Sequence, residues 1–405
     1  MTALGGLTVL DFSHALAGPY CTKLLADYGA DVYKIESPEG DIGRGWAPPF
    51  TNGEASYFLG INPGKLGVSI DLKRPEGVDL CLRLIEEADV LVENLRVGTL
   101  ERLGLGYAAA SARNPKLVYC SISGYGQDGP SREQPAMDLI LQASSGLISV
   151  TGSERGEVAR CGHSVADITA GIFALTGILM ALRARETTGA GQFVDVSMFD
   201  SMISAMASNF ANYEGTGMVP SPLGTAFATI VPYRTFPTAD REIALAVGSE
   251  KLWTGFCKAI GHPELERHPD YVTNAVRVKN RGVLEPMLAD ILRGATAAEW
   301  VRRLSAEGVP CSPVRTLNEV TGDPQAAARG MFVPVEHPVA GSFLVTGPPV
   351  KLSETPGAVR GPAPQLGEHT REVLARLLDL TEPELDRLEA AGVISQARLR
   401  SRRSG

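Results

Sequence analysis

The feature that most constrains this fold is an alternation of short β-rich runs with helical segments in the first part of the chain. Residues 7–12 and 31–36 are rich in Val, Leu, Ile and Tyr, and the segment 19–28 between them starts with Pro and is followed by Gly29. Pro in the first turn and Gly just past the end are typical of a helix. A strand, a helix and a strand in this order predict a βαβ unit with parallel strands.

The alternation continues along the chain. It predicts helix 75–87, strand 89–92, a second helical stretch, strand 117–122, helices from 137 to 184 with a break near 151–162, strand 192–197 and helix 198–213. Strands that alternate with helices favour an α/β fold with a doubly wound parallel sheet.

A segment rich in Gly and Pro then interrupts the pattern, and we interpret residues 214–224 as a linker. Residues 225–324 follow with two β-rich runs and three helical segments, which predicts a smaller α+β domain. The next part mixes short strands with many prolines and closes with helices near 368–391, and the basic, polar stretch 395–405 is expected to fray.

Composition and charge exclude several classes of function. The chain has 405 residues, 44% of them hydrophobic, and a net charge of −8, which argues against a nucleic-acid partner. We find no unbroken apolar run long enough to span a membrane and no basic segment followed by an apolar stretch at the N-terminus, so we expect a cytoplasmic protein without a membrane partner. The six cysteines are scattered without the spacing of a zinc site, and we predict no metal.

The common nucleotide-binding and hydrolase motifs are missing. The turn after residues 7–12 has one Gly and a Pro and does not match GxGxxG, so a nicotinamide cofactor is not expected. GxxxxGK[ST] and GxSxG are absent as well. Backbone amides at the start of the helix near Pro19 could still receive a phosphate or a carboxylate.

Asp167 is the most informative single residue because it stands at the start of a long apolar helical segment, 168–182. An Asp at this place could simply cap the helix, since the first amides of a helix have no internal partner. The helix dipole would also favour its ionised form. Asp138 precedes another helical segment and has the same simple interpretation, and we interpret His163, four residues before Asp167, as structural or as a surface residue.

Several motifs in order resemble CoA-transferase family III, the CaiB/BaiF family, over nearly the whole chain. They are AGP at 17–19, LADYGADV at 25–32, KIE at 34–36, ADVLVENLR at 88–96, RLGLGY at 102–107, SGYGQDGP at 123–130, TTGAGQ at 187–192, DPQ at 323–325 and GEHT at 367–370. This resemblance implies an intertwined homodimer with a Rossmann-like large domain made of residues 1–213 plus 325–405.

The resemblance also implies that acyl-CoA is a substrate and that no cofactor is tightly bound. It assigns contacts with CoA to seven positions: His14, Leu16, Ala17, Arg44, Asn94, Leu95 and Arg102. The residues themselves leave simpler roles open, because His14 could cap local backbone groups and each arginine could be a solvated surface charge.

The implied chemistry places the acyl group on Asp167, through an aspartyl anhydride and an aspartyl-CoA thioester, with Asp138 supporting the site. In the racemase branch of the superfamily a His commonly stands where this chain has Met137, and a thioether cannot carry a proton. The motifs near Trp46, Tyr57 and Gly224 look most like the branch that takes succinyl-CoA and dicarboxylic acids.

Alternatives remain at this point. The chain could be a racemase-like enzyme for 2-methylacyl-CoA or a non-catalytic CoA-binding subunit of a hetero-oligomer. A formyl-CoA and oxalate enzyme is disfavoured, because that branch has a glycine-rich loop where residues 224–229 have one Gly, while carnitine, bile-acid and aryl-acid acceptors stay open. Arg44 and Arg234 are the candidates for binding the free carboxylate of a dicarboxylic acid.

Overall fold

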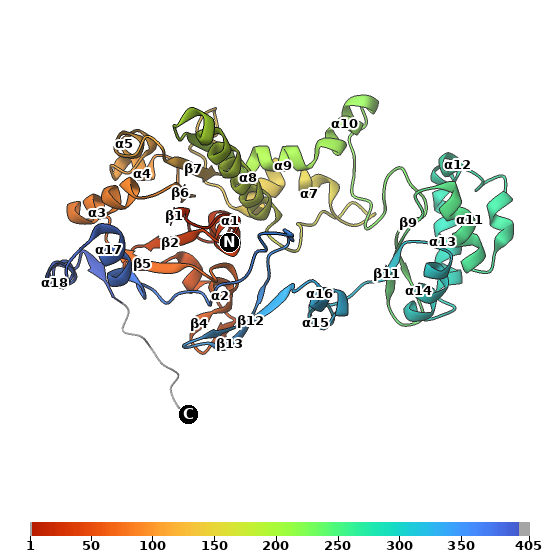
Figure 1. The fold of residues 1–405 in the computed structure, drawn as a ribbon. Helices are drawn as coiled ribbons and strands as arrows, with labels where there is room; N and C mark the ends of the chain where they lie inside the picture. Colours follow the sequence, from red (N-terminus) through yellow and green to blue (C-terminus); the bar gives the residue numbers. More distant parts are fainter. Residues whose placement is uncertain (1, 397–405) are drawn as a thin grey trace. The chain divides into compact units, whose positions relative to one another are not determined.

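The structure is a computed structural model that describes residues 2–396, and the chain divides into two units (Figure 1). The large unit comprises the described parts of Met1–Leu147, Cys161–Gly217 and Pro324–Gly405, and the small unit comprises Ile148–Arg160 and Met218–Asp323. The predicted fraying of residues 395–405 falls almost entirely outside the described residues.

The large unit is built on a seven-stranded sheet in the order β14-β5-β2-β1-β6-β7-β8. The strands are β1 (Thr8–Asp11), β2 (Asp31–Glu36), β5 (Leu66–Ile70), β6 (Val90–Glu93), β7 (Val118–Ser123), β8 (Phe193–Ser197) and β14 (Ile394–Ser395). Every neighbouring pair is parallel except β14 with β5. The large, mainly parallel sheet expected from the alternation is therefore confirmed, and the strand order reverses its direction between β1 and β6.

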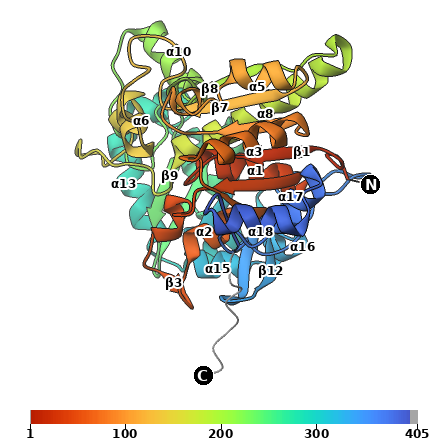
Figure 2. The same cartoon turned by 90° about the vertical axis from the view of Figure 1, so that its left-hand side faces the viewer.

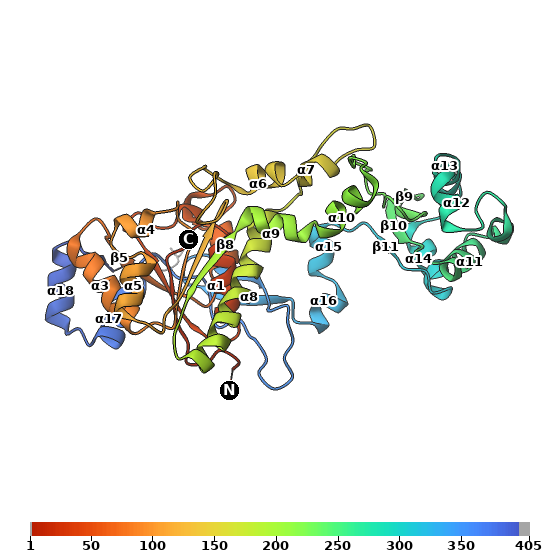
Figure 3. The same cartoon turned by 90° about the horizontal axis from the view of Figure 1, so that it is seen from above.

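Helices cover both faces of this sheet, as Figure 3 shows. One face carries α1 (Ala17–Asp27), α8 (Val165–Thr188) and α9 (Met198–Ala205), and the other carries α3 (Pro75–Glu86), α5 (Tyr107–Arg113), α17 (Thr370–Leu378) and α18 (Glu382–Ala390). Successive strand residues point to opposite faces, so Val9 and Val90 join the core under α1 and α8, whereas Leu10 and Leu91 join the core under α3 and α17. Burial on both faces explains why these strands read as nearly continuous apolar runs.

Helix α8 packs closely against α1. A side chain at Gly171 would bring its Cβ within 2.7 Å of the Ala17 carbonyl oxygen, so the contact requires glycine. By length and composition α8 is the one helix among residues 2–396 that could cross a membrane, although the core helix of a water-soluble protein passes the same test. The face of α8 that includes Ala166, Ala170 and Ile178 is buried in the core of the large unit.

Segments from both ends of the sequence meet in the large unit, and Figure 2 shows α17 and α18 beside the strands of the N-terminal half. Strand β14 pairs with β5, matching Ile394 with Ile70. The remaining elements of this unit are η1 (Ile42–Gly45), β3 (Phe50–Thr51), β4 (Glu54–Ala55), α2 (Ser56–Ile61), α4 (Thr99–Arg102), α6 (Asp138–Ser144), α10 (Ala207–Thr216), α16 (Pro324–Ala328), β12 (Phe332–His337) and β13 (Gly341–Thr346). Helix α7 (Leu147–Val150) leads from the large unit into the small one.

The small unit has a three-stranded antiparallel sheet in the order β11-β10-β9 and a core around Trp253, Phe256 and Trp300. Its elements are β9 (Tyr233–Pro237), β10 (Glu242–Ala246), α11 (Glu250–Ala259), η2 (Pro263–Arg267), α12 (Asn274–Lys279), α13 (Arg281–Leu292), α14 (Ala297–Ala306), β11 (Cys311–Pro313) and α15 (Leu317–Thr321).

The division differs from the predicted domain boundaries in two places. Residues 148–160 belong with the small unit, because the Gly224 amide donates to the Gly152 carbonyl at 2.9 Å and Arg234 pairs with Glu154 at 2.6 Å. The predicted linker 214–224 begins inside α10, which continues to Thr216 before the unit ends at Gly217.

Candidate active site

Two loops meet at the carboxyl edge of the large sheet, where the strand order reverses. The backbone amide of His14, just after β1, donates to Asn94 Oδ1 at 2.7 Å, and Asn94 Nδ2 donates back to the His14 carbonyl at 2.8 Å. Asn94 directly follows β6. The structure thus brings together two of the residues assigned to CoA contact, at the kind of edge where open α/β sheets bind ligands.

Asp167 lies in the first turn of α8, but it does not cap the helix. The N-cap position is Ser164, whose side chain makes no capping hydrogen bond. The cap comes from α6, because Asp138 Oδ1 accepts a hydrogen bond from the Ala166 amide at 2.9 Å. Asp138 is the first residue of α6 and caps a helix other than its own, which leaves the carboxylate of Asp167 available for other contacts.

Asp138 is itself held by a buried amide. Gln142 Nε2 donates to Asp138 Oδ2 at 2.6 Å, and Gln142 Oε1 accepts from the Cys161 amide at 2.8 Å. Both oxygens of Asp138 are therefore hydrogen-bonded, and the carboxylate is fixed beside the start of α8. The sequence did not single out Gln142, which lies one helical turn after Asp138.

The electrostatic environment of Asp167 differs from the expectation that the helix dipole keeps this carboxylate ionised. Burial, and then the negative charge of Asp138, raise the pKa of Asp167 to about 7, and a hydrogen bond from the Ala17 backbone opposes this only in part. Among residues 2–396 no ion pair neutralises Asp167. The dipole is outweighed because removing a carboxylate from water beside a second carboxylate disfavours its charge.

Tyr57 is a member of this site that we did not assign from the sequence. It belongs to α2 and packs edge-on against Trp46 with ring centroids 5.2 Å apart, and a Cβ added at Gly43 would lie 3.5 Å from its ring. Burial and then the charge of Asp167 raise the pKa of its hydroxyl, followed by smaller effects of Asp41 and Asp138. Because α2 is far from α8 in the sequence, no local pattern could have linked Tyr57 with Asp167.

The predicted CoA contacts after β1 differ in exposure. Leu16 and Ala17 are buried, so a ligand could reach them through the backbone but hardly through the side chains. His14 is half-buried, and burial lowers the pKa of its ring in spite of the nearby Asp41, so the imidazole is neutral at neutral pH.

The predicted contacts after β6 are anchored by a buried acid. The Leu95 amide donates to Glu93 Oε2 at 2.8 Å, while the other oxygen of Glu93 accepts from the Ser121 hydroxyl. Burial raises the pKa of Glu93 to about 7. Leu95 itself packs against the core beneath α3 and α17, so its side chain is partly used in folding.

The arginines assigned to phosphate or carboxylate binding have other partners as well. Arg44 donates from Nε and Nη2 to the two oxygens of Glu36, both at 2.7 Å, and its guanidinium lies 3.7 Å from the centre of the Phe58 ring. In the small unit, Arg234 pairs with Glu154 and Glu285 at 2.6 and 2.7 Å. Both roles remain predictions, and a substrate anion would compete with these acidic partners.

Arg102 remains more accessible. It is exposed on α4 and donates to the Thr99 hydroxyl at 3.1 Å, a contact that a phosphate could replace at little cost. His163 lies just before α8 and Met137 just before α6, and both side chains are exposed. Among residues 2–396 no group of three or more His, Cys, Asp or Glu side chains is arranged to hold a metal ion.

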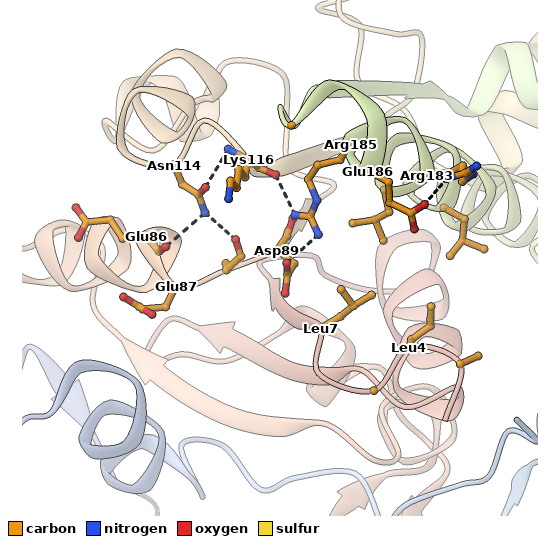
Figure 4. A pocket seen from close by; sticks show the side chains of 16 residues that line it. Leu4, Leu7, Glu86, Glu87, Asp89, Asn114, Lys116, Arg183, Arg185 and Glu186 are labelled. Atoms are coloured by element: carbon orange, nitrogen blue, oxygen red, sulfur yellow. Dashed lines mark hydrogen bonds and ion pairs between the residues drawn. The ribbon is translucent and has the colours of Figure 1, made fainter. Parts of the chain in front are cut away.

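A separate cavity of about 770 Å³ lies at the opposite, amino edge of the sheet, and its lining contains none of the predicted site residues (Figure 4). Its charged groups are largely paired, because Arg185 donates to Asp89 at 2.9 Å and to the Lys116 carbonyl at 3.0 Å. Asn114 similarly donates to the Ala88 carbonyl at 2.7 Å. This arrangement ties the ends of strands and helices together and offers no reactive group.

Comparisons with known proteins agree with the resemblance. Residues 4–370 match the model of CoA-transferase family III. The chain is 36% identical to succinyl-CoA:glutarate CoA-transferase of Mus musculus, covering 98% of this chain and 91% of that protein, and 37% identical to succinyl-CoA:mesaconate CoA-transferase of Haloarcula hispanica, covering 92% and 96%.

The fold agrees as well. The crystal structure of a CaiB/BaiF family protein from Brucella suis superposes with a TM-score of 0.84 at 35% identity, covering 93% of this chain and 99% of that one. Agreement in sequence and in fold over nearly the whole length identifies the chain as a transferase that belongs to CoA-transferase family III.

Proposed function

We propose that this protein transfers CoA from an acyl-CoA donor, such as succinyl-CoA, to a small dicarboxylic acid, with Asp167 as the nucleophile. The observation that carries this proposal is the state of Asp167 at the carboxyl edge of the sheet: its helix is capped by Asp138, and its own carboxylate has no ion-pair partner among residues 2–396. A carboxylate without a neutralising cation is less stabilised in the ground state and therefore more reactive toward an acyl carbon.

The first half of the exchange loads the enzyme. An ionised oxygen of Asp167 attacks the thioester carbonyl of the donor, the C–S bond breaks, and CoA leaves as a thiolate, so that an aspartyl acyl anhydride remains. The thiolate then attacks the Asp167 carbonyl carbon, the donor acid leaves as a carboxylate, and CoA is held as an aspartyl thioester.

The second half repeats these steps in reverse with the acceptor. The acceptor carboxylate attacks the aspartyl thioester and releases CoA thiolate, which gives a second anhydride. The thiolate attacks the acceptor's acyl carbon, and the carboxylate of Asp167 is restored. The cycle consumes no proton and retains the thioester free energy, provided that water is kept away from the anhydrides.

The names of the relatives support the substrate class. The mouse and Haloarcula proteins are named for succinyl-CoA as donor and for glutarate or mesaconate as acceptor, and both acceptors are dicarboxylic acids. Their identities to this chain are nearly equal, so they favour the class of acceptor rather than one acid.

We further propose that the protein acts in the cytoplasm as a homodimer. Helix α8 is apolar on almost all sides, yet Ile172, Phe173, Leu179 and Met180 on its outer face are exposed. A second copy that covers this face would remove it from water. Sedimentation equilibrium should then give twice the chain mass of 42.9 kDa, and a monomer at micromolar concentration would contradict the dimer.

The decisive experiment offers succinyl-CoA and a panel of carboxylic acids to the purified protein and follows new acyl-CoA species by mass. We expect fastest exchange with dicarboxylic acids of about five carbons. Hydroxylamine added during turnover should modify the peptide that contains Asp167. Release of CoA without any new acyl-CoA across the panel would contradict the proposal, as would modification at a different residue.

Assays of the same purified protein distinguish CoA transfer from the two alternative functions. A racemase-like enzyme would exchange the α-proton of 2-methylacyl-CoA with deuterated water, and we expect none because Met137 cannot act as an acid or a base. A non-catalytic CoA-binding subunit would bind acyl-CoA but show no exchange without a second type of chain.

A further inference from the structure

The turn between β1 and α1 is held by side chains at five successive backbone groups. The Ser13 amide donates to Asp11 Oδ1 at 3.0 Å, and the Ser13 carbonyl accepts from Lys34 Nζ at 2.8 Å. Asn94 binds both the amide and the carbonyl of His14, and the Ala15 amide donates to Asp41 Oδ1 at 3.0 Å. Such complete anchoring is uncommon in a surface loop and indicates that the turn must keep one conformation.

Ala15 in this turn has a left-handed backbone conformation, with φ of 62°. For a residue with a side chain this conformation costs about 1 kcal/mol or more, so the surrounding contacts must stabilise it. Asp41 provides the contact at the Ala15 amide, and the same oxygen accepts from the Gly43 amide at 2.8 Å.

Asp41 is in turn held by a buried cation. Lys34 Nζ lies 2.8 Å from Asp41 Oδ2, and both side chains are almost completely buried. Burial opposes both charges, yet Asp11 and Asp41 raise the pKa of Lys34 while Lys34 lowers the pKa of Asp41, so the pair is ionised at neutral pH. Glu36 also fixes Asp41, because Glu36 Oε1 accepts from the Asp41 amide at 2.9 Å.

The anchored turn ends beside the helix that carries the proposed nucleophile. Two residues after Ala15, Ala17 begins α1, and its backbone amide acts to lower the pKa of Asp167. The close contact of Gly171 with the Ala17 carbonyl fixes the same residue from the side of α8. The position of the Ala17 amide therefore depends on the backbone angles of the turn.

We propose that the buried Lys34–Asp41 pair positions this turn, so that the Ala17 amide points at the oxygen of Asp167 that becomes an oxyanion when the aspartyl intermediates form and decay. The inference rests on the proposed function and adds two positioning residues to it. An amide held in place stabilises the developing negative charge without reorganising during the reaction.

The test measures how fast succinyl-CoA acylates the enzyme in a single turnover, by rapid quenching and intact mass, from pH 5.5 to 8.5. Asp41→Ala should slow acylation by about ten- to a hundredfold, because it removes the acceptor for the Ala15 amide. It should also move the acid limb of the profile to higher pH, since displacing the Ala17 amide weakens the effect that lowers the pKa of Asp167. The variant keeps the side chains of Asp138 and Tyr57, the other groups whose charges interact with Asp167, although it removes one of the charges that raise the pKa of the Tyr57 hydroxyl.

Two further variants make the test specific. Ala15→Gly in the Asp41→Ala background should restore part of the rate and of the pH profile, because glycine adopts a positive φ without strain. The matched control is Asp71→Ala, which removes a turn carboxylate that accepts from the Lys73 amide at 2.9 Å and pairs with Arg74 at 3.5 Å. The control should keep the parental rate and profile.

The results distinguish this inference from the proposed function. A folded Asp41→Ala enzyme with the parental rate and an unmoved acid limb would overturn the positioning role, even though CoA transfer continued. If Asp41→Ala does not fold, Asp41→Asn decides, because it keeps an acceptor for Ala15 but loses the charge facing Lys34; a parental profile there would equally overturn it. An Asp167→Ala enzyme that still transfers CoA would instead remove the proposed function.

Discussion

The two ends of α8 follow the same rule of helix electrostatics but have different partners. Asp167 lies in the first turn and Arg185 in the last, the ends where the helix dipole favours an acid and a base. At the last turn Arg185 is paired with Asp89 at 2.9 Å and bonded to the Lys116 carbonyl. At the first turn Asp167 faces a second acid, Asp138, and its pKa rises to about 7.

The difference shows which end is structural and which is reactive. A paired charge contributes to stability and has no reason to react, whereas a buried carboxylate beside another carboxylate is costly to keep. The capping contact from Asp138 to the Ala166 amide makes the reactive end possible, because it satisfies the helix without using Asp167. Three substitutions test this contrast.

The largest effect is expected at Asp167. Asp167→Ala should reduce CoA exchange by about a thousandfold or more, because no other group can carry the acyl intermediate. The rate of new acyl-CoA formation measures this, with the circular dichroism spectrum as a check of folding. The matched control at the other end of α8 is Asp89→Ala, and a comparable loss of exchange there would break the contrast.

An intermediate effect is expected at Asp138. Only ionised Asp167 attacks, so kcat/KM should fall as the pH falls below about 7. Asp138→Asn removes a negative charge that raises the pKa of Asp167, so the acid limb should move to lower pH while the maximal rate falls about tenfold through the disturbed cap. If the acid limb of the kcat/KM profile did not move in Asp138→Asn, burial alone would set the pKa of Asp167.

The smallest effect is expected at the last turn. Arg185→Met should lower the free energy of unfolding by about 1 kcal/mol, because it removes a partly buried ion pair and a hydrogen bond. Exchange activity should stay within about twofold of the parent. Urea unfolding measures the change, with Arg183→Met as control, since Arg183 pairs with Glu186 at an exposed position and should cost less.

Much of the large unit could be predicted from the sequence. The periodic runs located five of the seven strands of the sheet and its principal helices, because most of these strands are buried on both faces and read as apolar runs. We did not predict strands β5 and β14. The β5 sequence LGVSI contains Gly and Ser, and β14, with two residues, is too short to show a periodic pattern. The grouping of 148–160 with the small unit has no signal in the local sequence, because it arises from through-space contacts such as those of Gly152 with Gly224 and of Glu154 with Arg234.

The candidate site divides in the same way. Asp167 and Asp138 could be named from the sequence, because an acid before an apolar helix is a local pattern and the family motifs surround them. The interaction of Tyr57 with Asp167 could not be predicted, and neither could the link from Lys34 through Asp41 to the Ala15 amide, since these interactions join segments separated in the sequence.

The sequence by itself determined the parallel sheet, the order of its helices and an acidic residue at the start of α8, because these follow from short-range periodicity and helix-end chemistry. Only the tertiary structure decided which acid caps α8 and which remains free. That choice depends on α6 bringing Asp138 within 2.9 Å of the Ala166 amide, and on burial that lifts the pKa of Asp167. Both are through-space effects, which depend on distance and solvent exposure rather than on position along the chain.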